Sequence, residues 1–187
     1  MTDYVSPYGD AAYRAASDRD VPLDRQFEGK VAVVTGSTQG LGLTVVKLML
    51  RRGLKGALIM GRKEAEGKAA AEALSTPEKR VVYHQVDLTN LEDCQSVHDR
   101  AIQEFGGYDI LVNSAGITDR GGILDGDAAL WERTFAINAR APFFLMQNAS
   151  NHWRAEGKPG SVVNVATVTA HGGVPFLTVY AASKAAL

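Results

Sequence analysis

Near the end of the chain a tyrosine and a lysine stand four residues apart, in Tyr180-Ala-Ala-Ser-Lys184. On a helix, positions i and i+4 lie on one face, one turn apart. A phenol with an unperturbed pKa of about 10 transfers protons poorly at neutral pH, whereas a neighbouring ammonium favours the phenolate and lowers that pKa. The pair therefore predicts a general acid/base, Tyr180, assisted by Lys184. An amphipathic surface pair with the same spacing is the alternative.

The stretch from Thr35 to Gly42 is rich in glycine and lies between a short apolar run and a helical pattern. Glycines permit a tight turn and let backbone amides approach a pyrophosphate, and a helix N-terminus adds partial positive charge. The spacing Gly-x-x-x-Gly-x-Gly differs from the commonest dinucleotide fingerprint and lacks the Gly-Lys-Ser/Thr of a P-loop. Its place after the first strand favours a dinucleotide site over a plain strand-to-helix turn. The expected binding residues are Gly36, Ser37, Thr38, Gln39, Gly40, Leu41 and Gly42.

The residues after the second expected strand bear on the choice of cofactor. An acid about 20 residues beyond the glycines would bind the ribose 2′-hydroxyl of NAD(H), whereas an arginine accommodates the 2′-phosphate of NADP(H). Gly61 takes the place of the acid here, and Arg62 follows it. This favours NADP(H), with NAD(H) as the second candidate, unless Arg62 is an ordinary solvated loop residue. Gln39 is uncharged and adds no support for NADP(H).

An alternation of strands and helices must position these residues. Short apolar runs, expected to be strands, cover residues 31–35, 57–60, 81–86, 109–113 and 161–166. Patterns with a helical period cover about 41–52, 64–74, 91–105 and 128–152, and a last one opens near 179. Runs that are apolar throughout suit strands covered on both faces. The predicted fold is therefore α/β: a doubly wound, Rossmann-like parallel sheet in three α/β/α layers.

Two helices carry local signals. The apolar residues Leu41, Val45, Leu48 and Met49 share one face of the first helix, and Gly53 is expected to stop it. The helix from about residue 91 has Thr89 or Asn90 as its candidate N-terminal cap and Gly106 as its end.

Pro142 interrupts the long helical stretch over 128–152. Proline cannot donate to the carbonyl four residues earlier, which is that of Asn138, and its ring pushes this carbonyl aside. We therefore expect a kink that leaves the Asn138 carbonyl free for water. The alternative is that Pro142 occupies an early position in a second helix and that the stretch is split in two.

The bulk composition excludes several classes. The 187 residues suffice for one domain with a hydrophobic core, and 45% of them are hydrophobic. A net charge of −1 gives no electrostatic signature for nucleic acid or for an anionic membrane. The sequence has neither a signal peptide nor an apolar run long enough for a membrane span, so we expect a cytoplasmic protein.

The sulfur and imidazole side chains give no sign of a metal site. Cys94 is the only cysteine, so it forms no intramolecular disulfide, and it is expected to be a small buried side chain on a helix. His84, His98 and His152 have no metal-ligand spacing, and no metal is predicted.

Together these features resemble the short-chain dehydrogenase/reductase family in its ordinary, non-extended form. The resemblance runs from about Gly29 to Leu187 and rests on motifs in a fixed order: Thr35-Gly36-x-x-x-Gly40-x-Gly42, Asp87 after the third strand, Asn113-Ser114-Ala115-Gly116, Asn138, and Tyr180-x-x-x-Lys184. It implies hydride transfer between a nicotinamide cofactor and a small alcohol or carbonyl substrate.

The resemblance also implies catalytic roles. Tyr180 would exchange a proton with the substrate oxygen, and Lys184 would bind the nicotinamide ribose and depress the tyrosine pKa. Asn138 would belong to a water-mediated proton relay behind the lysine. Thr167 stands where the family usually has serine. A threonine hydroxyl also donates to a carbonyl oxygen, but its methyl group narrows the pocket and restricts χ1.

Further residues are assigned to the cofactor in the same way. Asp87, with its neighbour Leu88, would lie near the adenine. Asn113, Ala115 and Gly116 would pass close to the adenosine half of the dinucleotide, and Asn113 is expected to be structural rather than catalytic. After Thr167, the residues Thr169 and His171 could line the substrate entrance, although His171 is interpreted as a loop histidine.

The expected organisation is an N-terminal arm, 1–27, followed by a dinucleotide-binding and catalytic domain, 28–187. The family pattern continues with a further strand and a substrate-capping region that this domain lacks, and it implies a homodimer or homotetramer at full length. Two other functions stay open. Thr167 and the abrupt end of the chain favour a catalytically inactive nucleotide-binding scaffold or sensor. A sugar-nucleotide epimerase or dehydratase on a related fold has a different glycine spacing and a longer chain.

Overall fold

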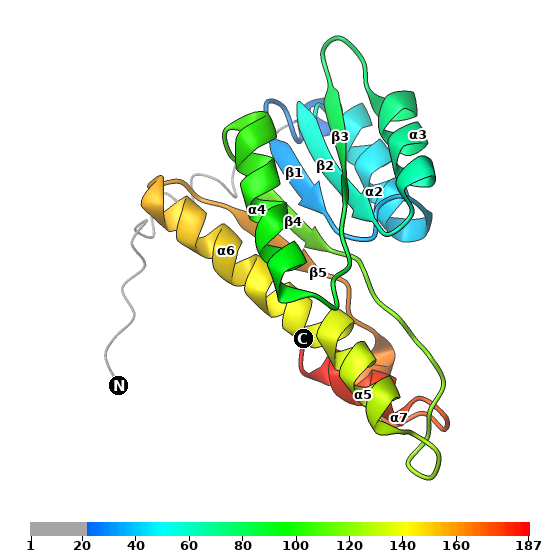
Figure 1. Cartoon of the computed structure of the whole chain (residues 1–187). Helices are drawn as coiled ribbons and strands as arrows, with labels where there is room; N and C mark the ends of the chain where they lie inside the picture. Colours follow the sequence, from blue (N-terminus) through cyan, green and yellow to red (C-terminus); the bar gives the residue numbers. More distant parts are fainter. Residues whose placement is uncertain (1–21) are drawn as a thin grey trace, which may run out of the picture.

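Five parallel strands form one sheet in the order β3-β2-β1-β4-β5 (Figure 1). The computed structural model describes residues 22–187, so most of the arm expected over 1–27 lies outside the described residues. The strands are β1 (Val31–Val34), β2 (Gly56–Gly61), β3 (Arg80–Gln85), β4 (Ile110–Asn113) and β5 (Ser161–Asn164). Because every neighbouring pair is parallel, all the carboxyl ends meet at one edge of the sheet. This topology confirms the expected Rossmann-like α/β fold.

Helices cover both faces of the sheet (Figure 1). They are η1 (Leu23–Arg25), α2 (Gly40–Arg51), α3 (Glu64–Leu74), α4 (Leu91–Phe105), α5 (Ala128–Phe135), the π-helix η2 (Ala136–Arg140), α6 (Ala141–Ala155), the 3₁₀ turn η3 (Val168–Ala170) and α7 (Thr178–Ala185). Helices α2 and α3 pack on one face, and α4 and α6 pack on the other. The expected three layers are therefore present.

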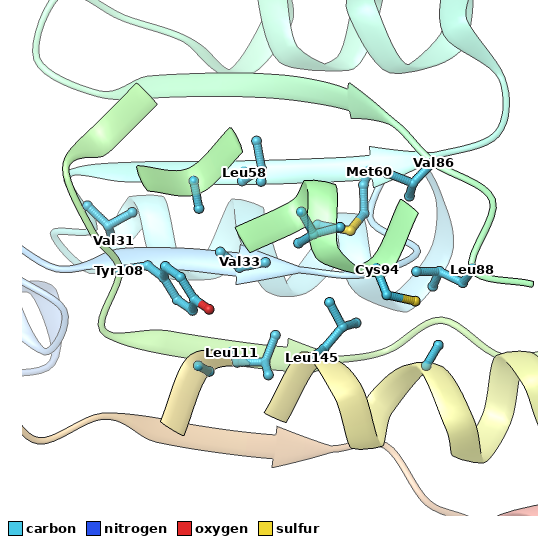
Figure 2. Close-up of a cluster of buried hydrophobic side chains, with 14 of the residues drawn as sticks. Val31, Val33, Leu58, Met60, Val86, Leu88, Cys94, Tyr108, Leu111 and Leu145 are labelled. Carbon is cyan, nitrogen blue, oxygen red and sulfur yellow. The ribbon is translucent and has the colours of Figure 1, made fainter. Parts of the chain in front are cut away.

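The side chains of β1 alternate between two hydrophobic clusters. Val31 and Val33 pack toward α4 and α6, in the cluster drawn in Figure 2. Ala32 and Val34 pack toward α2 and α3 on the opposite face. Successive residues of a strand point to opposite faces, so a strand that is apolar throughout has both faces covered. All four residues of β1 are buried.

The apolar face expected for the first helix is partly wrong. Leu41 and Leu48 are exposed, whereas Val46, Met49 and Leu50 are buried against the sheet. Apolar residues surround most of α2, so the sequence period alone does not select the face that packs. The helix ends as expected, because Gly53 follows it with a φ of 93°.

The long helical stretch is divided into three parts rather than kinked at one point. α5 gives way to the π-helix η2, where the N–H of Ala141 donates to the carbonyl of Ala136, five residues earlier. α6 then begins, with Pro142 in its first turn. The interpretation of Pro142 as an early helix position is thus correct for α6. The π-helix, which contains Asn138, was not predicted.

The ends of α4, the burial of Cys94 and the length of β5 were also predicted from the sequence. The Asn90 side chain caps α4 by accepting the N–H of Glu92, and Gly106 ends that helix in the left-handed conformation, as expected. Cys94 is buried in α4, also as expected. The fifth strand ends at Asn164, two residues earlier than predicted.

Two further findings concern the part of the chain that the structure covers. Within residues 22–187, none of the helices combines the length and the apolar character that a membrane crossing requires. Over the same residues, no group of three or more His, Cys, Asp or Glu side chains is arranged to hold a metal ion.

Candidate active site

A cavity of about 340 Å³ opens at the carboxyl ends of β1, β2, β3 and β4. In an open α/β sheet this edge is the usual place for a ligand. The cavity is lined by residues from the glycine-rich loop and from the segments that follow β2, β3 and β4: Gly36, Thr38, Gln39, Gly40, Leu41, Gly42, Met60, Gly61, Arg62, Lys63, Glu66, Val86, Asp87, Leu88, Ser114, Ala115, Gly116, Ile117 and Ile137. Most of the residues expected to bind a dinucleotide are in this set.

Close packing shapes the glycine-rich loop. Gly36 has a φ of 62°, and a side-chain carbon added to it would lie 2.8 Å from the Cα atom of Ala115. A carbon added to Gly42 would lie 2.5 Å from the carbonyl oxygen of Gly36. Neither position has room for a side chain, so the loop presents bare backbone at the start of α2, where amides and the helix dipole attract anions.

Ser37 makes its hydrogen bonds within the sheet. Its side chain is fully buried and donates to the carbonyl of Val34, while it accepts the N–H of Met60 at 3.0 Å. The Ser37 N–H also donates to the carbonyl of Met60. Ser37 therefore joins the end of β1 to β2 and lies outside the set that lines the cavity.

Charged side chains stand at the far end of the cavity from α7. Arg62 and Lys63 both line it, and the Lys63 ammonium forms an ion pair with Glu66 at 2.7 Å. The Asp87 carboxylate accepts the N–H of Thr89 at 3.0 Å and its hydroxyl at 2.8 Å. These hydrogen bonds, followed by the positive charge of Arg62, hold the pKa of Asp87 below its ordinary value, against the opposing effect of burial. Asp87 thus offers a fixed acceptor to a ligand.

The end of β4 is tied to β1 through one hydroxyl. Thr35 Oγ1 accepts the N–H groups of Ser114 and Ala115 at 3.0 and 2.9 Å, which places this segment along the cavity. Asn113 is buried beneath it, and its Nδ2 donates to Oδ1 of Asn164 on β5 at 2.8 Å. Asn113 does not line the cavity and joins β4 to β5.

Asn138 connects three segments from the π-helix. Its amide pairs with the backbone of Ile117 in both directions, accepting the N–H and donating to the carbonyl, each at 2.9 Å. Asn138 Nδ2 also donates to Oγ of Ser183 on α7 at 3.0 Å. Ser183 in turn donates to the carbonyl of Tyr180 at 2.7 Å. The fully buried amide therefore holds α7 against the segment that follows β4.

Lys184 reaches from α7 to the cavity wall. Its side chain is buried, and Nζ donates to the carbonyl of Val165 just after β5 at 2.7 Å. Nζ also lies 3.5 Å from the point where a side-chain carbon of Gly116 would stand, and Gly116 lines the cavity. Burial lowers the pKa of the Lys184 ammonium. Tyr180 lies one helical turn before Lys184 and is half-buried.

Thr167 lies between β5 and α7. It is the N-cap of the 3₁₀ turn η3, and its Oγ1 accepts the N–H of Thr169 at 3.4 Å. η3 packs against α7, the helix that carries Tyr180 and Lys184. The four residues expected to be catalytic thus occupy adjoining elements beside one end of the cavity, although none of them is among the residues that line it.

Several participants were not anticipated from the sequence. Ser183 and the backbone groups of Ile117 and Val165 hold the expected catalytic residues in place. Lys63 and Glu66 add charge beside Arg62. Only Ser183 had a signal in the sequence, since it lies inside the Tyr-x-x-x-Lys motif. The backbone contacts depend on long-range packing that a local pattern does not contain.

Comparisons with known proteins agree with this geometry. A family model described as short chain dehydrogenase matches residues 30–187. Galactitol 2-dehydrogenase of Agrobacterium fabrum is 34% identical over 162 residues, which cover 87% of this chain and 62% of that protein. 2-Dehydro-3-deoxy-D-gluconate 5-dehydrogenase of Escherichia coli is 33% identical over 158 residues, covering 84% of this chain and 61% of that protein.

A solved structure is similar throughout the same region. A short chain dehydrogenase/reductase family protein superimposes with a TM-score of 0.75 at 37% sequence identity, covering 86% of this chain and 65% of its own. The chain therefore spans less than two thirds of the length of the relatives described here.

Proposed function

Because the chain belongs to the short-chain dehydrogenase/reductase family, we propose that the full-length protein transfers a hydride between a nicotinamide dinucleotide and an alcohol or carbonyl substrate. Residues 28–187 would form its dinucleotide-binding and catalytic domain. One observation carries the proposal: Gly116 lines the cavity and also lies beside the Nζ atom of Lys184. A molecule bound along the cavity is thereby brought to the helix that bears Tyr180.

The cavity fits the adenosine diphosphate half of a dinucleotide. Its volume of about 340 Å³ lies in the usual range for ligand pockets. The bare backbone between Gly36 and Gly42 would hold the pyrophosphate, and the carboxylate of Asp87 would accept from the adenosine. When bound, the nicotinamide supplies the carbon that gives or receives the hydride.

The remaining chemistry belongs to side chains of this chain. Tyr180 would transfer a proton between its hydroxyl and the substrate oxygen, and the Lys184 ammonium one turn away would stabilise the phenolate. An ammonium has three protons, so the bond from Lys184 to Val165 leaves two for ribose hydroxyls.

The Thr167 hydroxyl would donate to the substrate oxygen. The amide of Asn138, already committed to Ile117 and Ser183, would fix the position of α7.

NADP(H) is the preferred cofactor in this proposal, with NAD(H) as the second candidate. Arg62 lines the cavity directly after β2, where a 2′-phosphate would lie, and no acid occupies the position of Gly61. Lys63 adds a second cation, although its charge is shared with Glu66. An arginine matches the geometry of a phosphate better than a lysine does.

The substrate is proposed at the level of class. The relatives named above are dehydrogenases of a polyol and of a sugar acid, by their names. A secondary alcohol, or the ketone it gives on oxidation, is the corresponding substrate for this protein. The second candidate function is a nucleotide-binding scaffold or sensor without catalysis, which the threonine at position 167 favours.

Replacing Tyr180 with phenylalanine in the full-length protein tests the proposal. General acid/base catalysis contributes roughly 10²- to 10⁴-fold, so turnover of NADPH with a ketone panel should fall at least about 100-fold in Tyr180→Phe. The affinity for NADPH, measured by fluorescence titration, should be unchanged. Tyr108→Phe is the matched control, since Tyr108 precedes β4 at the opposite edge of the sheet. Undiminished turnover in Tyr180→Phe would contradict the role, and NADPH binding with no turnover by the unmutated protein would favour the scaffold.

A further inference from the structure

We propose that Thr169 is a positioning residue for Thr167, because it occupies the acceptor sites of the Thr167 hydroxyl and directs the Thr167 proton toward the substrate oxygen. This inference rests on the proposed oxidoreductase function. Thr169 lies in the short turn η3 and is not among the residues that line the cofactor cavity.

Two hydrogen bonds within η3 converge on one oxygen atom. Thr167 Oγ1 accepts the backbone N–H of Thr169 at 3.4 Å and the hydroxyl of Thr169 at 3.3 Å. Thr167 has an extended backbone, with φ −150° and ψ 154°, as an N-cap requires. Val168 between them is 82% exposed, whereas both threonines are half-buried.

The number of sites on a hydroxyl decides what Thr167 can still do. A threonine hydroxyl has one proton to donate and two lone pairs that accept. When both lone pairs receive hydrogen bonds from Thr169, the proton is the only remaining site, so Thr167 acts as a donor. A substrate carbonyl or alkoxide oxygen needs a donor at this point of the reaction. The hydroxyl of Thr169 therefore makes the Thr167 hydroxyl a hydrogen-bond donor to the substrate.

Both bonds are long for their types, since N–H···O bonds are usually about 2.9–3.0 Å and O–H···O bonds about 2.7–2.8 Å. Catalytic hydrogen bonds are often long in an unloaded site and tighten when the substrate is bound. The branched side chain of Thr167 also has a restricted χ1, so the oxygen is held near one position. Thr169 then needs only to orient the hydroxyl proton of Thr167. A serine at position 167 would have a less restricted χ1, so its hydroxyl oxygen would be held less firmly.

Three single variants of the full-length protein test the inference, with NADPH and 2,3-butanedione or a ketohexose as probes. Thr169→Val keeps the shape and the backbone N–H but removes the hydroxyl, whereas Thr169→Ser keeps the hydroxyl. Losing one hydrogen bond of about 1 kcal/mol should lower kcat about 3- to 10-fold in Thr169→Val, and Thr169→Ser should stay within about twofold of the unmutated protein. Thr76→Val is the control, because the Thr76 hydroxyl bonds Glu78 on the exposed surface.

Binding and folding are measured on the same variants. The Kd for NADPH should be unchanged in all three, because the hydroxyl of Thr169 bonds none of the residues that line the cavity. The Tm of Thr169→Val should fall by no more than about 2–4 °C, which corresponds to one lost hydrogen bond of about 1 kcal/mol. If the kcat of Thr169→Val falls only at temperatures at which that variant begins to unfold, the Thr169 hydroxyl serves only the fold, and this result would overturn the inference.

A double-mutant cycle isolates the coupling. If Thr169 acts through Thr167, adding Thr169→Val to Thr167→Ala should cause no further loss of kcat, because the acceptor is already gone. Losses that multiply in the double variant would overturn the inference and leave the proposed function standing. An unmutated protein that binds NADPH but turns over none of the carbonyl probes would instead remove the proposed function, and the inference with it.

Discussion

Strands β2 and β5 end at the same edge of one sheet, but their surroundings differ. In β2, Leu58 and Ile59 are wholly buried and have helices on both faces. In β5, at the end of the sheet, Val162 is 38% and Val163 51% exposed. The half of the site that lines the cavity is therefore supported by apolar packing among the described residues, 22–187.

The half of the site around α7 is held in another way. Buried polar groups carry it: Asn138 bonds Ser183, and Lys184 bonds the carbonyl of Val165. Buried hydrogen bonds fix geometry more than they add net stability. Nucleotide binding and turnover should therefore respond to different substitutions, since apolar packing supports the nucleotide cavity and hydrogen bonds support the helix α7.

The largest effect should appear when the same kind of truncation is made in the two strands. Leu58→Ala removes a fully buried side chain and should lower the free energy of unfolding by about 2–5 kcal/mol. Val163→Ala should lower it by less than about 1 kcal/mol, because half of that side chain is already in water. Urea denaturation measures both values, and equal losses would break the comparison.

A smaller effect should separate binding from turnover. Arg62→Gln removes the cation that lines the cavity after β2, so the Kd for NADPH should rise about 5- to 20-fold, while the Kd for NADH changes by less than about twofold. The kcat at saturating NADPH should stay the same, because Arg62 is remote from α7. Arg154→Gln, on the exposed surface of α6, is the matched control. Equal effects on the two cofactors would remove the case for NADP(H).

The smallest expected effect is a pH dependence of stability at the contact between α4 and α6, which pack on one face of the sheet. His98 on α4 lies beside Tyr108 and His152. Burial, followed by the charge of His152, lowers the pKa of His98, against the opposing charge of Asp99. The unfolded chain then binds more protons than the folded one at pH values between the lowered pKa and about 6.5. Stability should therefore decrease as the pH falls through this window.

Urea denaturation at pH 7.5 and pH 5 measures how much the free energy of unfolding falls between the two pH values. This fall should be smaller in His98→Phe than in the unmutated protein. His171→Gln, in an exposed loop, should leave it as it is. If His98→Phe keeps the full pH dependence, the packing of α4 against α6 does not depend on a neutral His98.

The sequence predicted the parallel α/β sheet because β1 and β2 are apolar throughout and glycine marks the end of α2. It did not predict the buried face of α2. Leu41 and Leu48 fit a helical period as well as Val46 and Leu50 do, and only the position of the sheet distinguishes them. Leu41 is exposed because it lines the cavity.

Most residues of the glycine-rich loop could be assigned to the cavity from spacing alone. The role of Ser37 could not, since its partner Met60 lies 23 residues away on another strand. The π-helix was also beyond the sequence. Pro142 marks a local break, but the register around Asn138 depends on its bonds to Ile117 and Ser183, which come from distant parts of the chain.

The π-helix has a consequence for chain length. A π turn accommodates one more residue than an α turn, and each residue of an α-helix advances the direction of its side chain by about 100°. Deleting a single residue from Ala136–Arg140 would remove the extra residue of the π turn and rotate α5 by about 100° relative to α6, which would swing Asn138 away from Ile117. The placement of this amide therefore depends on the number of residues between α5 and α6, so this segment should tolerate substitution better than insertion or deletion.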